Sequence, residues 1–269
     1  MIRQPAVADQ FYPGDARQLT ATINALSPQV PEADKLTALA VVAPHAGYVY
    51  SGRVAAATFA QVKIPESVII LGPNHHGRGA SLAIVSEGAW ATPLGQVPIN
   101  GELSQLIKSH IPLAQEDSSA HRFEHSLEVQ VPFLQAARPG ITISPLVISQ
   151  LPYPSCQEIG RGLAMAIKEF GHPVLMLAST DMTHYQPRSL ASRQDHLALA
   201  RITELDPEGL YNTVLDHGIT MCGFIPTTIT LIAALALGAT KAELVSYSDS
   251  GEASGDTARV VGYAGLVIS

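Results

Sequence analysis

The sequence predicts an α/β fold: a single three-layer αβα domain with a mostly parallel or mixed central sheet covered by helices on both faces. Two observations lead to this prediction. Short continuous apolar runs, such as Ser67–Leu71 and Val174–Ala178, alternate with longer segments of helical pattern. Hydrophobic residues make up 46% of the 269 residues and charged residues 14%, a composition that can fill a large core. Because no repeat or linker interrupts the pattern, we expect one domain over residues 1–269.

The expected elements follow from these runs in chain order. Runs of apolar residues predict strands at Leu36–Ala43, Ser67–Leu71, Ser81–Val85, Ile141–Ile148, Val174–Ala178, Ala242–Tyr247 and Arg259–Val267. Between Glu87 and Asn100, the residues Trp90, Pro93 and Gly95 indicate a short hairpin. Helices are expected at Arg53–Gln61, Glu102–Ser109, His125–Ala137, Ser155–Phe170, Ser189–Glu204, Pro207–His217 and Pro226–Leu237.

Charge and composition restrict the possible partners and location. The formal net charge is −7 and no basic stripe is present, so we expect binding neither to nucleic acid nor to an anionic membrane surface. No signal peptide is recognisable at the start, and the apolar stretch Ile225–Leu237 contains a proline and is too short to span a bilayer. Two cysteines, Cys156 and Cys222, make no disulfide framework, so a reducing, cytoplasmic location is expected.

Histidines follow three of the predicted strands at the point where each strand ends. His45 follows the first strand, His75 follows the second, and His184 follows Val174–Ala178, three residues after Asp181. In open α/β sheets ligands bind beyond the carboxyl ends of the strands, where such segments converge. A lone histidine is more often a structural residue, but three converging segments favour a functional site. Neutral imidazole is a common ligand for iron, copper and zinc.

Two choices within this cluster concern neighbouring side chains. Adjacent residues in an extended loop point in opposite directions, so His75 and His76 cannot easily serve one metal ion. We favour His75 as the ligand because it lies nearer the strand end. His125 and Glu128 stand three apart at an expected helix start, a spacing that suits a ligand pair, a carboxylate supporting a ligand, or only a capped helix.

Cys222 lies just before the helix expected at Pro226, and a thiolate near a helix N-terminus is a soft metal ligand. Most free cysteines are instead small buried hydrophobic residues, and the local sequence alone favours that reading. Cys156 opens another helix and has no comparable neighbours, so we interpret it as structural.

Five motifs taken together resemble a known family. The chain contains APHAGYVYSG, LGPNHHG, EHSLEVQVPFL, STDMTHY and MCGFIP in this order, after an opening PAVADQFYP. It is thereby similar, over essentially its whole length, to the MEMO family, also called AmmeMemoRadiSam system protein B. One departure is Asp9, which stands where the family's opening motif usually has glycine, so the turn there is expected to differ.

The resemblance implies a fold like that of the class III extradiol dioxygenases, which hold Fe(II) with two histidines and a glutamate. In MEMO-like proteins the matching ligands are two histidines and a cysteine, here His45, His75 and Cys222. Asp181 and His184 match the acidic and basic residues beside that site, and His184 falls near the position of an acid/base histidine. Because thiolate favours softer metals such as Cu(I), the dioxygenase chemistry does not transfer automatically.

Three functions remain open on the sequence. The first is a non-haem oxidoreductase that uses Fe(II), with copper or zinc as other possible metals, and His184 and Asp181 as catalytic groups. The second is a non-catalytic scaffold or metal carrier whose pocket, lined by Tyr48, Tyr50, Trp90 and Tyr185, holds a peptide or small molecule. The third is a zinc hydrolase that uses the pair of Asp181 and His184 and would need Glu128 in the pocket to activate a nucleophile. The sequence makes no prediction about the substrate or the oligomeric state.

Overall fold

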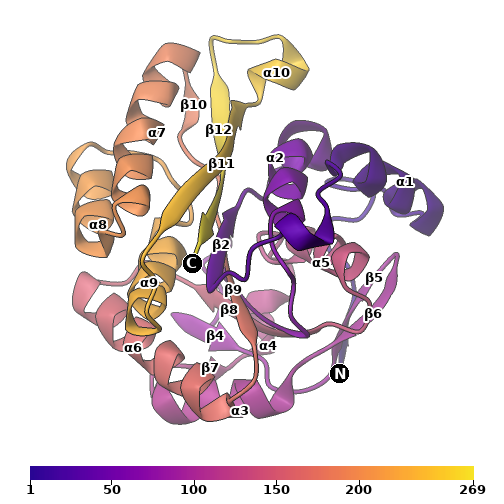
Figure 1. Cartoon of the computed structure of the whole chain (residues 1–269), viewed down its shortest axis with the longest axis vertical. Helices are drawn as coiled ribbons and strands as arrows, with labels where there is room; N and C mark the ends of the chain where they lie inside the picture. Colours follow the sequence, from indigo (N-terminus) through magenta and orange to yellow (C-terminus); the bar gives the residue numbers. More distant parts are fainter.

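A nine-stranded mixed sheet forms the centre of the computed structural model, which describes all residues from Met1 to Ser269 (Figure 1). Its strands are β2 (Ala40–Ala43), β3 (Ser67–Pro73), β4 (Leu82–Ile84), β7 (Gln115–Glu116), β8 (Thr142–Ile148), β9 (Val174–Ser179), β10 (His184–Gln186), β11 (Ala242–Asp249) and β12 (Val260–Ile268). The order along the sheet is β10-β12-β2-β9-β3-β8-β4-β7, and β11 pairs with β12. The four strands β2, β9, β3 and β8 are parallel neighbours, whereas β12 runs antiparallel to β2.

Helices cover both faces of this sheet. On one face lie α1 (Ala16–Leu26), α2 (Tyr48–Ala60) and α5 (Val131–Ala137). On the other lie α3 (Gly101–His110), α6 (Tyr153–Phe170), α7 (Arg188–Thr203), α8 (Pro207–Asp216) and α9 (Phe224–Ala236). Figure 1 shows α1 and α2 on one side of the strands and α7, α8 and α9 on the other. The predicted three-layer αβα fold is therefore confirmed.

The two cores follow from alternation along the strands. In β2, Val41 and Ala43 pack toward α1 and α2, while Ala40 and Val42 pack toward α6 and α9. Since successive side chains of a strand point to opposite faces, a strand covered on both faces must be apolar throughout. All of the residues of β2 are buried, which explains why its sequence is a continuous apolar run.

A small second sheet lies at the edge of the molecule. It consists of β1 (Ile2–Arg3), β5 (Ala89–Thr92) and β6 (Gly95–Pro98), so the predicted hairpin is present as β5 and β6. β1 pairs in parallel with β5, and this pairing places Ile2 and Arg3 beside Ala89 and Trp90. Further short elements are α4 (Ser118–His121), α10 (Gly251–Ser254) and two 3-10 turns, Glu32–Asp34 and Glu128–Gln130.

The helix expected at His125–Ala137 is wrong in its first half. The α-helix begins only at Val131, after the 3-10 turn Glu128–Gln130. The carboxylate of Glu124 accepts a hydrogen bond from the backbone N of Ser126 at 2.9 Å and so stabilises a non-helical turn. His125 and Glu128 consequently do not share a helix face.

Two other helices differ from the expected ones. α2 begins at Tyr48 rather than Arg53, directly after Gly47, so it starts within three residues of His45. α1 was not predicted, although Asp15 caps it by accepting hydrogen bonds from the backbone N of Arg17 and Gln18. Both helices pack on the same face of the sheet.

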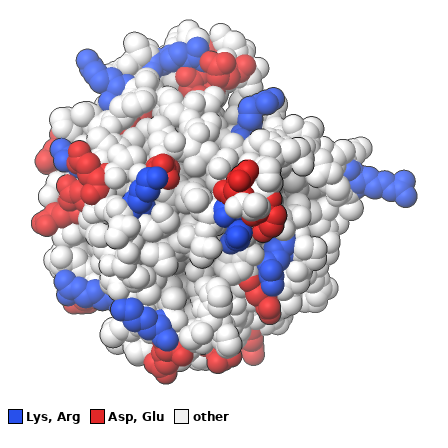
Figure 2. Space-filling view, in the orientation of Figure 1, with Lys and Arg blue, Asp and Glu red and all other residues white.

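Positive and negative side chains are interspersed on the face of the molecule shown in Figure 2. Small groups of both signs lie next to each other there, separated by broad uncharged areas. No helix of the structure combines the length and the apolar character that crossing a bilayer requires.

Candidate metal centre

Three neighbouring parallel strands end at one edge of the sheet and present the candidate site residues there. β2 leads into His45, β3 leads into His75, and β9, which lies between them, leads into Asp181. Parallel strands place their carboxyl ends on the same side, which is why residues far apart in sequence meet here. This arrangement agrees with the strand-end pattern read from the sequence.

Three histidines from this edge form the geometric core of the site: His45, His75 and His125 each offer a nitrogen atom within 4.8 Å of the other two. His45 is 2% exposed, whereas the His75 side chain is 29% exposed, so the cluster extends from the interior to the surface. His76 is outside it, because its Nε2 bonds instead to the carbonyl oxygen of Phe123 at 2.9 Å.

The tautomer of His45 is determined by Ser179. The Ser179 hydroxyl donates to the carbonyl oxygen of Ser126 at 2.6 Å and accepts from Nε2 of Gln130 at 2.8 Å. Its single proton is thus used, so at 2.9 Å it can only accept from Nδ1 of His45. His45 therefore carries its proton on Nδ1 and has a lone pair on Nε2. Burial, followed by the charges of His125, His75 and His184, lowers its pKa well below the usual value.

Glu124 determines the tautomer of His75 in the same way. Its Oε1 accepts from Nδ1 of His75 at 2.9 Å, and its Oε2 accepts from the His75 backbone N at 2.7 Å. Burial raises the pKa of Glu124, but the hydrogen bond and charge of His75 and the Ser126 N–H outweigh it, and the pKa falls to about 2. An ionised Glu124 can only accept, so His75 keeps its proton on Nδ1 and a lone pair on Nε2.

Cys222 lies against His45 in the loop before α9. Its Sγ is 3.3 Å from Nε2 of His45 and also 3.3 Å from the backbone N of Asp181. Gly223 permits this position, since a Cβ there would collide with the Ser179 carbonyl oxygen and the Thr180 side chain. Burial, reinforced by the charge of Asp181, raises the pKa of the Cys222 thiol. The thiol is neutral unless a cation binds beside it.

Asp181 and His184 flank this contact. Oδ1 of Asp181 accepts from the backbone N of His45 at 2.7 Å. Burial raises the pKa of Asp181 to about 6, although the hydrogen bonds from the backbone N of His45 and Ala46 lower it. Nδ1 of His184 faces the carbonyl oxygen of Thr220 at 2.9 Å and so carries a proton, which leaves Nε2 with a lone pair. The charge of His184 acts on both His45 and Asp181, so the predicted catalytic pair lies within electrostatic reach of the cluster.

The structure changes the role considered for Glu128 and assigns one to His125. Glu128 is 1% exposed and accepts hydrogen bonds from the N-terminal segment, so it does not enter the cluster and cannot activate a nucleophile there. Support for a zinc hydrolase that uses Glu128 is thereby removed.

His125 joins the cluster. Its ring is stacked on that of His75 with the centroids 4.6 Å apart, and burial lowers the pKa of His125 to about 4. The carboxylate that supports a histidine is Glu124, which the sequence reading missed.

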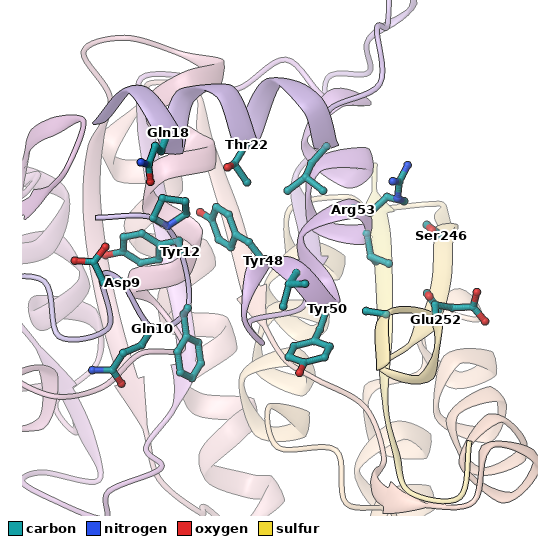
Figure 3. A pocket seen from close by; sticks show the side chains of 17 residues that line it. Asp9, Gln10, Tyr12, Gln18, Thr22, Tyr48, Tyr50, Arg53, Ser246 and Glu252 are labelled. Atoms are coloured by element: carbon teal, nitrogen blue, oxygen red, sulfur yellow. The ribbon is translucent and has the colours of Figure 1, made fainter. Parts of the chain in front are cut away.

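A cavity of about 780 Å³ lies between the N-terminal segment, α1 and α2 (Figure 3). Phe11 forms part of its wall and also contacts the His125 ring, with the ring centroids 4.8 Å apart, but no residue of the cluster lines the cavity. Tyr48 and Tyr50 line this cavity. Trp90 does not, because it packs under the Arg3 guanidinium at 4.4 Å, and Tyr185 lies exposed beside His184.

A family model described as Memo-like protein matches residues 3–267. The chain belongs to the Memo-like family. Relatives in this family include a MEMO1 family protein of Aquifex aeolicus, which is 41% identical over 267 residues covering 99% of this chain and 98% of the relative. A MEMO1 family protein of Methanopyrus kandleri is 40% identical, with 99% of both chains covered. The resemblance inferred from the five motifs is thus confirmed over nearly the full length.

Among solved structures, the crystal structure of uncharacterized protein JW3007 from Escherichia coli K12 superimposes on this family member with a TM-score of 0.55. It covers 84% of this chain and 98% of its own length at 17% sequence identity. Similarity at that identity shows the shared fold, and it is consistent with the three-layer αβα architecture described above.

Proposed function

We propose that this Memo-like protein is a non-haem metal-dependent oxidoreductase whose ion is held by His45, His75 and Cys222. Fe(II) is the metal that we expect first, with copper and zinc as the other candidates. The observation that supports the proposal best is the pair of fixed tautomers, because Ser179 and Glu124 both leave an Nε2 lone pair available in the cluster. The two free thiols suit the reducing cytoplasm that we propose as its location.

The spacing of one pair of proposed donors, Cys222 and His45, suits a transition-metal ion. Bond lengths of about 2.0 Å to imidazole nitrogen and 2.3 Å to thiolate sulfur imply roughly 3.1–3.6 Å between two donors on one ion. The distance from Cys222 Sγ to His45 Nε2, 3.3 Å, lies in that range. The rings of His45 and His75 are inclined by 80°, so their in-plane lone pairs can converge.

We propose Cys222 rather than His125 as the third ligand on the family resemblance and on its 3.3 Å contact with His45, although the donors within 4.8 Å of one another are those of His45, His75 and His125. The rings of His75 and His125 are stacked with an interplanar angle of 20°, so their in-plane lone pairs run nearly side by side. Two such rings cannot both direct a nitrogen at an ion only about 2 Å away unless one rotates. We therefore propose that His125 faces the ligand side of the centre, where Phe11 holds its ring.

The chemistry that the ion supplies when bound is a redox couple and open positions for small ligands. The protein's own residues supply position and proton transfer. Asp181 fixes the backbone of His45 and shares the buried pocket with Cys222, while His184, whose Nδ1–H is bound to Thr220, can take up a proton on Nε2.

Metal analysis of protein purified without oxygen tests the binding part of the proposal. We expect one equivalent of metal in the wild type and its loss in His45→Ala, His75→Ala and Cys222→Ala, with the fold retained by circular dichroism. His76→Ala is the matched control and should keep its metal, because His76 bonds to Phe123 outside the cluster. Full occupancy in all three ligand variants would contradict the assignment.

Oxygen consumption by the Fe(II)-loaded protein tests the redox part. Small aromatic and reducing compounds serve as candidate substrates, and we expect Asp181→Asn to retain metal while turning over more slowly. The absence of oxygen uptake with every compound tried would contradict an oxidoreductase.

A non-catalytic role is the second candidate, because the cavity walled by Phe11, Tyr48 and Tyr50 offers space for a small molecule or peptide. Metal-dependent binding of a ligand in this cavity without any product formation would favour that role.

A further inference from the structure

The first residues of the chain are tied to the segment that carries Glu124 and His125. Arg3 makes the connection through its guanidinium group, and its side chain is only 10% exposed. Its Nε donates to the carbonyl oxygen of His121 at 2.7 Å, and its Nη2 donates to that of Glu124 at 2.8 Å. The Trp90 ring lies 4.4 Å beneath it, so the planar group is held on its face as well as at its edges.

Glu128 completes this connection from the other side. Its Oε2 accepts from Nη1 of Arg3 at 2.7 Å, while its Oε1 accepts from the backbone N of Val7 at 3.0 Å and from the hydroxyl of Tyr12 at 2.7 Å. The backbone N of Ala6 also donates to this carboxylate at 2.9 Å. The carboxylate is 99% buried and its acceptor positions are used, so residues 3–12 form one bonded unit with Glu128.

The same contacts lead directly to the candidate metal centre. Arg3 bonds to the backbone of Glu124, and the Glu124 carboxylate holds both the backbone N and Nδ1 of His75. Residues 122–127 have no regular secondary structure, so their position depends on such side-chain contacts rather than on a helix or sheet. Phe11, from the same N-terminal segment, contacts the His125 ring.

We propose that Arg3 is a positioning residue for the metal centre, and that docking of residues 3–12 and metal binding stabilise each other. The inference rests on the proposed metal binding at His45 and His75. Because coupling between two events is reciprocal, a bound ion should hold the N-terminal segment more firmly, and a released segment should weaken metal binding.

Metal affinity and backbone hydrogen exchange together test this coupling. Competition with a chelator measures the affinity for Zn(II) and Co(II), and exchange of the Ala6 and Val7 amides reports the contact with Glu128. In the wild type, adding Zn(II) should slow exchange at both amides. Arg3→Gln should lose about 10- to 100-fold in metal affinity, the usual effect of removing an outer partner of a ligand, and should change the visible spectrum of bound Co(II).

Other variants separate positioning from general destabilisation. Arg3→Lys retains the charge but not the forked geometry, so it should not restore the affinity. Arg17→Gln removes an exposed arginine of α1 and should bind metal like the wild type. Tyr12→Phe removes only one hydrogen bond to Glu128, so its metal affinity should lie between those of the wild type and Arg3→Gln. This variant keeps the test available if Arg3→Gln does not fold.

The outcomes distinguish the two proposals. A wild-type protein that binds no metal overturns the proposed function and with it this coupling. A wild type that binds metal, together with an Arg3→Gln variant of unchanged affinity and Co(II) spectrum, overturns the positioning role alone. If Arg3→Gln does not fold, unchanged affinity and unchanged amide exchange in Tyr12→Phe overturn it instead.

Discussion

Replacing Glu124 by glutamine isolates the effect of one buried carboxylate on the proposed metal ligand His75. The carboxylate accepts three N–H donors: the backbone N and Nδ1 of His75, and the backbone N of Ser126. A glutamine amide has one accepting oxygen and one donating nitrogen. In Glu124→Gln, therefore, at least one of these three N–H groups faces another donor.

The structure sets the size of the expected effect. The pKa of Glu124 lies at about 2 rather than 4.5, so the site favours the ionised carboxylate over the acid by about 3 kcal/mol. If Nδ1 of His75 loses its acceptor, the ring is no longer fixed with its lone pair on Nε2. Removing such a partner weakens metal binding about 10- to 100-fold, which corresponds to roughly 1.4–2.8 kcal/mol.

Isothermal titration of Zn(II) with a competing chelator measures this loss. Glu243→Gln is the control, because Glu243 is an exposed carboxylate on β11, away from the cluster. We expect the control to match the wild type and Glu124→Gln to lose at least tenfold, with both variants folded. Affinity within twofold of the wild type in Glu124→Gln would refute the role of this carboxylate.

Three further predictions concern stability and position. Burial and the charge of Arg3 lower the pKa of His121 to about 4, so between pH 6.5 and 4 the unfolded chain binds a proton that the folded protein does not. Acidification over this range should therefore lower the free energy of unfolding by up to about 3 kcal/mol. In urea unfolding, His121→Gln should lose less stability on acidification than the wild type, and an equal loss would contradict this. Ser179→Ala removes the acceptor of the His45 Nδ1 proton, so metal affinity should fall about tenfold by the same titration. Gly223→Ala should lower the free energy of unfolding by about 1–3 kcal/mol in thermal denaturation, since its Cβ collides with the Ser179 carbonyl; an unchanged melting temperature would argue against that.

The strand-end histidines were predictable because two regularities coincide in the sequence. His45 and His75 each lie two residues after the end of a buried strand, and parallel neighbours such as β2, β9 and β3 place those ends together. The order of the strands was not predictable in this way. That β9 lies between β2 and β3, and so places Asp181 beside His45, depends on pairings between distant residues.

The interpretation of residues 124–128 shows where local reasoning failed. Spacing put His125 and Glu128 on one helix face, but Glu124 caps a turn with its own side chain and the helix starts later.

The left-handed turn at Asp9, with φ of +62°, is in the region that usually favours glycine, and the Asp9 carboxylate stabilises it by accepting from the backbone N of Gly14 at 2.8 Å.

The sequence by itself determined the α/β class, the family, and the presence of His45, His75 and Asp181 at the ends of strands. These features depend on local periodicity and on motif order, which a linear chain displays. Only the tertiary structure decided that Glu124 supports His75, that His125 joins the cluster, and that Arg3 ties the N-terminal segment to it. Those contacts join residues 49 to 121 positions apart, and no local pattern specifies which buried polar groups will satisfy one another once the chain is packed.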